Sequence, residues 1–278
     1  MVGIIDVGGG MRGIYGAGVF DRCLNEKMYF DCCIGVSAGS ANIASFLGKQ
    51  RERNYRFYTD YAFHKEYMSF SNYIKTGSYI GLDYIYGTLS NENGLDPLNY
   101  NEISEYKGKY YIVATDTDTA KPHYFENKDL SLNNYKILNA SSCIPVICKN
   151  VEISGRQFCD GGVSDPVPVD KAFETGCDKV VVILTKPKDF IKNSKTDSKG
   201  AAIIKHKNPL LAQAILKRAE IYNKSVQSAK KMEKEGKCLI IAPDDCCGVN
   251  TLSKSKEKLD ALYKKGYSDA ERIIDFIK

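Results

Sequence analysis

The chain has 278 residues, of which 43% are hydrophobic and 26% are charged. Such a length and balance are ordinary for a globular protein, and they allow one α/β domain with a substantial buried core. The net charge of +5 is too small to indicate a nucleic-acid-binding protein, and no basic run is interleaved with aromatic residues as in RNA-binding strands.

The first 50 residues alternate between strand-like and helix-like segments. Residues 2–7 form a short apolar run that ends in a glycine cluster, and residues 14–26 have apolar positions at helical spacing. A second strand is predicted at residues 30–36, followed by a helix of small residues at 37–48. This order is typical of a mostly parallel sheet that is covered by helices.

Residues 55–111 depart from this alternation because they hold 12 of the 19 tyrosines. Tyrosine combines an apolar ring with a polar hydroxyl group, so it suits surfaces that meet both lipid and water. Two interpretations are open for this tyrosine-rich segment: a lid or acyl-binding groove, and the aromatic outer surface of packed helices.

Further strands are predicted at residues 110–115, 156–159, 179–184 and 237–241. The last two are nearly continuous apolar runs, as central parallel strands are when both faces of the sheet are covered. Residues 255–278 are predicted to form a closing amphipathic helix. Its core-facing positions would be Leu259, Leu262, Ile273, Ile274 and Ile277.

Residues 186–237 are rich in lysine and are predicted to be mostly helical, with a loop at 189–200. This stretch contains 14 basic and 5 acidic residues. A surface that contacts an anionic membrane and an ordinary solvated helix face are both open interpretations. We predict a single domain over residues 1–278, with a three-layer α/β/α architecture and a mostly parallel central sheet.

A candidate catalytic motif stands between the second strand and its helix: Gly35-Val36-Ser37-Ala38-Gly39, of the form G-x-S-x-G. This is the context of a nucleophile elbow, in which a tight turn exposes the serine hydroxyl. Side chains at Gly35 and Gly39 would collide with neighbouring backbone, and the helix behind Ser37 favours negative charge at the reacting carbonyl. The alternative is a small-residue turn without catalytic function.

Three consecutive glycines follow the first strand, where residues 8–13 read GGGMRG. Their backbone N–H groups are unshielded, and such a nest at the start of a helix can hold an anion. A nucleotide-phosphate loop is the competing interpretation, but the pattern matches neither of the two common phosphate-binding motifs. An oxyanion hole fits the same physics, with Arg12 supplying positive charge or anchoring the loop.

Asp160 is followed by Gly161 and Gly162, directly after the strand-like residues 156–159. By itself this sequence is equally typical of a hairpin turn. A Ser-His-Asp triad in the order of the α/β-hydrolases would have to use His206, the only histidine after Asp160. His206 lies between two lysines in a stretch that we expect to be solvated, so a Ser–Asp dyad is favoured.

The three motifs, in this order, resemble the patatin-like phospholipase family, whose pattern is G-G-G-x-R-G, then G-x-S-x-G, then D-G-G or D-G-A. Residues 140–145 are similar to the family's block ahead of the aspartate. The resemblance covers roughly residues 2–185. It departs from the family at Val7, because the acidic residue Asp6 lies one step before it.

The resemblance implies a patatin-like α/β/α fold that hydrolyses acyl esters of lipids, with Ser37 as the nucleophile and Asp160 as its base. The oxyanion hole would be formed by Gly8, Gly9, Gly10 and Arg12. No cofactor is implied. Three functions compete with this one: a thioesterase or acyltransferase with the same dyad, a catalytically silent lipid-binding module, and a nucleotide-binding protein.

The 10 cysteines and 3 histidines indicate neither a disulfide framework nor a metal site. Several cysteines lie in apolar runs, where a free thiol behaves as a small hydrophobic group, and none has C-x-x-C spacing. The first residues read as a strand rather than a signal peptide, and no apolar stretch reaches the roughly 20 residues of a membrane span. We expect a cytoplasmic protein, with peripheral membrane contact left open.

Overall fold

The computed structural model describes residues 1–278, and its centre is an eight-stranded mixed sheet. The strands are β1 (Val2–Asp6), β2 (Cys32–Val36), β3 (Lys109–Asp116), β4 (Pro122–Glu126), β5 (Val151–Ile153), β6 (Arg156–Asp160), β7 (Lys179–Ile183) and β8 (Cys238–Ile241). Their order across the sheet is β5-β6-β3-β2-β1-β7-β8, with β4 also paired to β3.

The five central strands, from β3 to β8, pair in parallel, whereas β4 and β6 pair antiparallel with β3, and β5 with β6. The mostly parallel sheet predicted from the alternating elements is therefore confirmed. The predicted strands agree with the observed ones to within two residues at either end, whereas the short edge strands β4 and β5 were not predicted.

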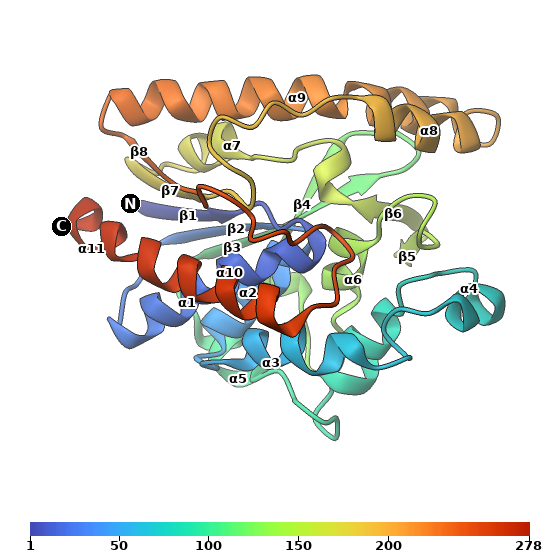
Figure 1. Ribbon diagram of the computed structural model, residues 1–278, viewed down its shortest axis with the longest axis horizontal. Helices are drawn as coiled ribbons and strands as arrows, with labels where there is room; N and C mark the ends of the chain where they lie inside the picture. Colours follow the sequence, from blue (N-terminus) through green and yellow to red (C-terminus); the bar gives the residue numbers. More distant parts are fainter.

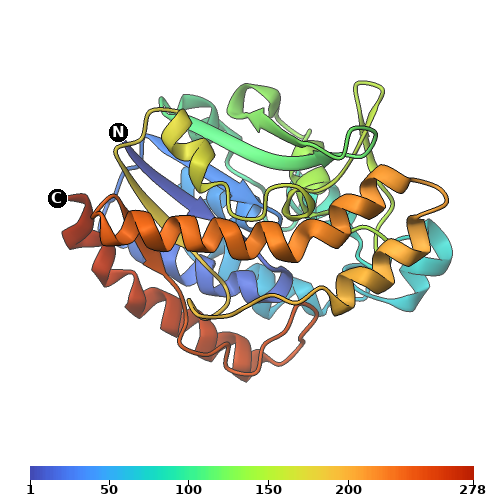
Figure 2. The same ribbon diagram turned by 90° about the horizontal axis from the view of Figure 1, so that it is seen from above.

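Helices cover both faces of the sheet, so the predicted three-layer architecture is confirmed (Figures 1 and 2). The helices are α1 (Ile14–Asn25), α2 (Ala38–Leu47), α3 (Arg53–Thr59), α4 (Phe70–Thr76), α5 (Tyr100–Glu105), α6 (Lys136–Ser142), α7 (Val169–Glu174), α8 (Lys195–Ile204), α9 (Pro209–Lys234), α10 (Lys256–Asp269) and α11 (Glu271–Ile277). The long helix α9 runs across one face together with α7, while α1, α2 and α10 lie on the other (Figures 1 and 2). Both termini lie at the end of the molecule opposite α4 and α8 (Figure 1).

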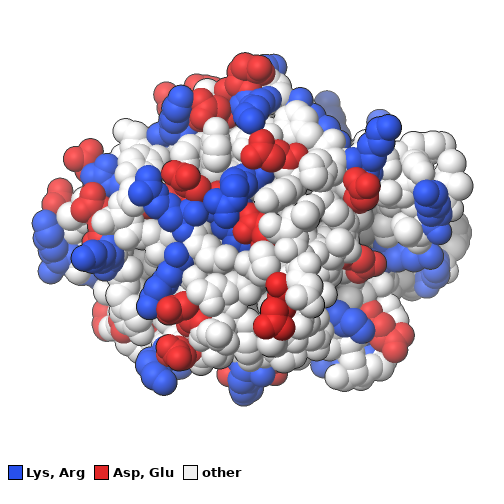
Figure 3. Space-filling model, turned by 90° about the horizontal axis from the view of Figure 1, so that it is seen from below, with Lys and Arg blue, Asp and Glu red and all other residues white.

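The surface away from α9 carries no continuous area of one charge. Acidic and basic side chains are intermixed there around a largely uncharged central region (Figure 3). No helix in the structure is both long and apolar enough to traverse a bilayer.

Neighbouring residues of the central strands point to opposite faces of the sheet. Ile4 and Val181 belong to the core beneath α1 and α2, whereas Ile5 and Val182 belong to the core beneath α7 and α9. All four side chains are completely buried. Because both faces are covered, the strands need apolar residues at consecutive positions, which explains the continuous apolar runs in the sequence.

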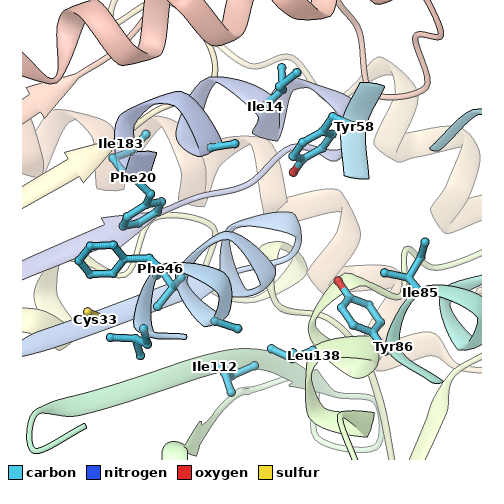
Figure 4. Close-up of a cluster of buried hydrophobic side chains, with 14 of the residues drawn as sticks. Ile14, Phe20, Cys33, Phe46, Tyr58, Ile85, Tyr86, Ile112, Leu138 and Ile183 are labelled. Carbon is cyan, nitrogen blue, oxygen red and sulfur yellow. The ribbon is translucent and has the colours of Figure 1, made fainter. Parts of the chain in front are cut away.

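The larger core also contains part of the tyrosine-rich segment (Figure 4). Phe20 of α1 packs against Phe46 of α2 with ring centroids 5.1 Å apart. Tyr58 and Tyr86 extend this core, and neither ring is more than 8% exposed. At these positions the tyrosines are core residues rather than an outer surface.

Two predicted elements differ in the structure. Helix α8 begins at Lys195, inside the predicted loop 189–200, because Asp197 and Ala201 of this segment are buried against α9. The predicted helix 255–278 is broken into α10 and α11 at Ala270. The break leaves the side chains of Ala270 and Ile273 completely buried.

The last third of the chain is built into the same sheet and helix layers as the first part. Strand β8 extends the sheet beyond β7, and α10 packs along α1. The two helices approach so closely that a Cβ atom on Gly266 would lie 2.0 Å from the carbonyl oxygen of Tyr15. The hydroxyl of Tyr15 also donates to Asp269 at 2.7 Å.

Candidate active site

Ser37 lies in the turn between β2 and α2, with φ at 56° and ψ at −132°. A positive φ is uncommon for a residue with a side chain and stores backbone strain. The turn is held by the Ser37 amide, which donates to Ser141 Oγ at 3.0 Å, and by Ser40 Oγ, which donates to the Ser37 carbonyl at 2.6 Å. The strand–turn–helix context of a nucleophile elbow is thus present at the G-x-S-x-G motif.

The two glycines of this motif are close to backbone atoms of the neighbouring turn and strand. A Cβ atom on Gly39 would lie 2.2 Å from the carbonyl oxygen of Asp6, and one on Gly35 would lie 2.4 Å from the Cα of Ser40. A side chain at Gly39 would push the elbow away from β1, and one at Gly35 would push α2 away from β2. The predicted collision with neighbouring backbone is therefore confirmed.

The segment 140–145 supports both candidate catalytic residues. Ser141 Oγ accepts the Ser37 amide and itself donates to the carbonyl of Val113 at 2.6 Å. The carbonyl of Cys143 accepts the backbone amide of Asp160 at 2.8 Å. Sequence comparison with the family pattern pointed to this segment, but these contacts could not be read from it.

The register of the sheet brings Ser37 and Asp160 to the same region. Strand β3 lies between β2 and β6, with Val36 opposite Val113 and Asp160 opposite Ala114. Ser37 directly follows Val36, so the two residues lie on either side of β3 at the same level of the sheet.

Asp160 is buried, with only 4% of its surface exposed. Its Oδ1 accepts the amide of Gly162 at 2.8 Å. Burial raises the pKa of Asp160, while the charge of Arg218, the nearby Ser37 side chain and the hydrogen bond from the Gly162 amide lower it. The charge of Lys192 acts in the same lowering direction. The carboxyl group lines the same polar cavity as Ser37.

The glycine loop is anchored by the acidic residue that precedes it. Asp6 is completely buried, and its carboxylate accepts the amide of Gly8 at 2.9 Å and the side-chain amide of Asn42 at 2.8 Å. Burial raises the pKa of Asp6 to about 6, although these two hydrogen bonds lower it. The amides of Gly9 and Gly10 make no hydrogen bond within the protein. No local sequence pattern predicts the anchoring contacts of Asp6 and Asn42.

Two cavities meet at Ser37. One is mostly apolar: 15 of its 24 lining residues are hydrophobic, including Tyr58, Tyr67 and Tyr86. The other is polar and has a volume of about 150 Å³. The predicted residues that line the polar cavity are Gly8, Gly9, Gly10, Arg12, Ser37 and Asp160. The structure therefore brings together every predicted site residue except Gly35 and Gly39, which shape the elbow.

Lys192 and Arg218 also line the polar cavity. Both belong to the lysine-rich stretch 186–237, which is far from the motifs in the sequence. No local pattern marks them, because their position depends on how α9 and the chain ahead of α8 pack over the glycines after Asp160.

None of the three histidines lines either cavity. His206 is exposed between α8 and α9, His64 contacts the hydroxyl of Tyr84 at 2.6 Å, and His123 packs against Phe125. The structure contains no cluster of three or more histidine, cysteine or acidic side chains that could share a metal ion. Asp160 is the carboxylate that lines the polar cavity together with Ser37.

A family model described as patatin-like phospholipase matches residues 7–173, which include the glycine loop, the elbow and Asp160. The chain belongs to the patatin-like phospholipase family. This membership confirms the resemblance seen in the sequence. A second model, a domain of unknown function (DUF6363), matches residues 208–278.

One curated protein and one solved structure are similar to the chain. The uncharacterized protein YjjU of Escherichia coli (strain K12) is 29% identical over 188 residues, which cover 67% of this chain and 52% of YjjU. The chain thus spans about half the length of that relative. The crystal structure of VipD from Legionella pneumophila is similar with a TM-score of 0.49 and 13% identity, over 98% of this chain and 66% of VipD.

Proposed function

We propose that this patatin-like chain is a serine hydrolase for acyl esters of lipids, with Ser37 as the nucleophile and Asp160 as its base. The observation that carries the proposal is the position of Ser37, on a strained elbow beside a buried carboxylate and between an apolar and a polar cavity. The apolar cavity has a volume of about 50 Å³ and offers an apolar wall to the first carbons of an acyl chain.

In the first half of the reaction, Asp160 takes the proton of Ser37 as Oγ attacks the ester carbonyl carbon. The tetrahedral intermediate then expels the alcohol, which leaves with the proton from Asp160, and the acyl group stays on Ser37. In the second half, water gives its proton to Asp160 and attacks the acyl-enzyme. The fatty acid leaves, and Ser37 recovers its proton. Burial raises the pKa of Asp160, which makes it a stronger base than an exposed carboxylate.

The oxyanion of the intermediate would be bound by the free amides of Gly9 and Gly10. Each such donor lowers the barrier by roughly 3 kcal/mol. The amide of Gly8 is engaged by Asp6, so the contribution of Gly8 is to shape the loop. Arg12 adds positive charge to the same cavity.

The tyrosine-rich segment would form the walls of the acyl site. Tyr58, Tyr67 and Tyr86 line the apolar cavity, and the hydroxyl of Tyr86 is satisfied by Ser142 Oγ at 2.9 Å. Because its polar tip is paired within the protein, Tyr86 presents its ring to the cavity rather than an unsatisfied hydroxyl group.

The proposal is tested by activity-based labelling and by turnover of p-nitrophenyl butyrate. A fluorophosphonate probe should label the wild type and not Ser37→Ala, which should retain the fold because serine and alanine differ by one oxygen. Asp160→Asn should lower kcat by about 10²–10⁴-fold, since an amide cannot accept the proton. His206→Ala is the matched control and should change little. Labelling that persists in Ser37→Ala, or activity lost in His206→Ala and kept in Asp160→Asn, would contradict the dyad.

The same dyad would also serve a thioesterase or an acyltransferase. Product analysis separates these reactions, because transfer to an added alcohol yields a new ester, whereas hydrolysis yields the free acid. A catalytically silent lipid-binding module would bind lipid without being labelled by the probe.

The proposal includes peripheral contact with an anionic membrane through α8 and the chain that leads into it. Ile191 and Ile203 are 75% and 67% exposed, and the exposed Lys195 and Lys199 lie between them in the sequence. Apolar side chains beside lysines are the combination that enters a headgroup region.

Eight of the ten cysteines are buried thiols, which supports the expected cytoplasmic location.

A further inference from the structure

A pocket lies away from the active site, among the C-terminal ends of α1, α2 and α5. Its volume is about 780 Å³, within the range of roughly 300–1,000 Å³ that small-molecule sites occupy. It shares no lining residue with the two cavities at Ser37. Ser37 precedes the first residue of α2, whereas Phe46 and Leu47 in its last turn line the pocket, so a helix of about 15 Å separates the two places.

The floor of this pocket is apolar and firmly packed. Phe46 and Leu47 are only 7% and 6% exposed, and both belong to the main core. The ring centroid of Phe46 lies 6.0 Å from that of Phe30 and 5.1 Å from that of Phe20 (Figure 4). The hydroxyl of Tyr106 donates to the carbonyl of Phe30 at 2.6 Å, so the polar end of this tyrosine is satisfied within the protein. An occupant therefore meets apolar atoms at the floor.

The backbone carbonyls at the ends of α1 and α2 are already paired. The amide of Lys27 donates to the carbonyl of Leu24 at 3.1 Å, and the amide of Lys49 donates to that of Phe46 at 2.9 Å. Lys27 and Lys49 have φ angles of 52° and 55°, the left-handed conformation that ends many helices. Unpaired carbonyls at a helix C-terminus would attract a cation. Because these carbonyls are paired, the charged side chains of the rim decide which ligand the pocket attracts.

The rim carries more positive than negative charge. Its charged side chains are those of Lys27, Lys49, Arg51 and Lys107, against Glu102 and Glu105. Lys49 pairs with Glu102 at 2.6 Å, and Arg51 pairs with Glu52, outside the pocket, at 3.4 Å. The hydrogen bond and charge of Glu102, together with the charge of Glu105, raise the pKa of Lys49. Both acids of the rim therefore act on Lys49.

Lys27 and Lys107 are the free cations of the rim. Both are exposed, and neither makes an ion pair. The rings of Tyr29 and Tyr106 meet with centroids 5.9 Å apart, which brings the chain around Lys27 beside the chain around Lys107. An anionic group at this part of the rim is attracted by both lysines.

An apolar floor below a cationic rim is complementary to a molecule with a hydrocarbon body and an anionic end. Phosphate groups are commonly bound by the paired donors of a guanidinium group, and the arginine of this rim is engaged by Glu52. Lysine acts as a compact charge, which suits a carboxylate. We propose that this pocket binds a long-chain fatty acid, with the carboxylate at Lys27 and Lys107 and the chain over Phe46 and Leu47. The inference does not depend on the proposed hydrolase function, because the pocket shares no residue with that site.

The first test compares head groups on one hydrocarbon chain by isothermal titration calorimetry, below the micellar concentrations. Decanoate should bind, decanol should bind about tenfold more weakly because it has no charge, and decyltrimethylammonium should show no binding. Dodecanoate should bind more tightly than decanoate, by up to about fourfold for each added methylene. Equal binding of the three head groups, or affinity that does not depend on chain length, would overturn the proposal.

The second test removes the free cations. Lys27→Gln combined with Lys107→Gln should weaken decanoate binding about tenfold and leave decanol binding unchanged. Both positions are exposed, so the fold should persist, which circular dichroism checks. Lys224→Gln combined with Lys234→Gln is the matched control, because it removes the same charge from exposed positions on α9, on the opposite face of the sheet. Equal weakening by both pairs would mean attraction by net charge alone and would overturn the site.

Photolabelling locates the bound chain. Decanoate with a terminal diazirine should label peptides that contain residues 24–30 and 46–51, in the wild type and in Ser37→Ala alike, and unlabelled decanoate should compete. Label confined to residues 53–98, which form most of the apolar cavity at Ser37, would overturn this pocket as the fatty-acid site. Absence of ester turnover with intact labelling of the pocket would reject the hydrolase function alone.

Two other occupants have distinct outcomes. Decyl phosphate presents the same chain with a phosphate group, and binding more than about tenfold tighter than that of decanoate would replace the fatty acid by a single-chain phosphate. A second copy of the chain is tested by sedimentation velocity. A dimer that Tyr29→Glu dissociates and decanoate leaves intact would assign the pocket to a contact between subunits, since Tyr29 is 56% exposed at its rim.

Discussion

Ser37 has a backbone conformation that an isolated serine avoids. Holding φ at 56° costs about 1–3 kcal/mol, and the surrounding contacts must offset this cost. The hydroxyl of Ser141 accepts the Ser37 amide, and Ser40 donates to the Ser37 carbonyl, so both polar groups of the strained peptide are paired. Hydrogen bonds with α6 and α2 therefore stabilise the strained backbone conformation of Ser37.

At the scale of single residues, the features that depend on neighbouring residues in the chain could be predicted from the sequence. The glycines around Ser37 and after Asp160 mark tight turns, and turns are encoded by residues next to one another. Lys192 and Arg218 enter the cavity because of packing between segments that are distant in the sequence. Charge alone could not distinguish them from the solvated lysines nearby.

Asp6 should make stability depend on pH. Its pKa rises from the ordinary 3.8 to about 6 on folding, so the folded state favours the protonated form. The corresponding stability is fully present below about pH 4 and is lost as pH rises through 6, by up to about 3 kcal/mol. Urea unfolding of the wild type and Asp6→Asn at pH 4 to 7 measures this, and the variant should show the smaller decrease. Parallel pH curves for the two proteins would contradict the shift.

At the scale of whole elements, the central strands and the helices α1 and α2 were predictable because their apolar patterns are long and regular. The edge strands β4 and β5 were missed, since short strands with exposed residues lack such a pattern. The first part of helix α8 falls in the predicted loop 189–200, because residues 195–200 are mostly polar. Its helical form depends on Asp197 pairing with Arg218 of α9, a contact between two elements.

The glycine of the elbow should be far less replaceable than a glycine with free space around it. Gly39→Ala should lower the free energy of unfolding by at least about 2 kcal/mol, because its Cβ overlaps the backbone of Asp6. Gly200→Ala in α8 is the matched control: its Cβ meets no atom within 4 Å, and alanine favours the helix by about 0.5–1 kcal/mol. Urea unfolding followed by circular dichroism measures both. Equal effects of the two substitutions would mean that the elbow is not tightly packed.

The lysines of α8 should matter only for substrate in a membrane. Each contributes about 1 kcal/mol near an anionic leaflet, and salt screens this attraction as the Debye length falls from about 10 Å at 0.1 M to about 3 Å at 1 M. Hydrolysis in anionic vesicles should therefore fall with salt, while turnover of p-nitrophenyl butyrate stays constant. Lys195→Ser combined with Lys199→Ser should mimic high salt on vesicles alone. If neither salt nor the double substitution changes turnover in vesicles, α8 is an ordinary solvated helix surface.

At the scale of the molecule, we propose that residues 1–278 form one domain, including the segment matched by the domain of unknown function. Strand β8 completes one edge of the sheet, α10 packs on α1, and Arg218 of α9 bonds to the carbonyl of Gly162. Each of these contacts joins the C-terminal segment to an element of the patatin-like match. The two family models therefore match different parts of the sequence, but both parts contribute to one continuous structure.

One domain predicts one cooperative transition. In native-state hydrogen exchange, the amides of β8 should open with the same free energy as those of β2, because both need the whole sheet to unfold. Mass spectrometry of peptides from the two strands, over a series of urea concentrations, measures both values. Exchange of β8 and α10 at lower urea than β2 would show a separate C-terminal unit.

The meeting of two cavities at Ser37 has a consequence for how this fold can diversify. The apolar cavity takes most of its wall from residues 53–98, whereas the basic groups of the polar cavity, apart from Arg12, come from residues 186–218. Ser37 and Asp160 stand between them, on either side of β3. The two walls are therefore encoded in separate stretches of the gene, so substitution or recombination can change one while the other is inherited intact.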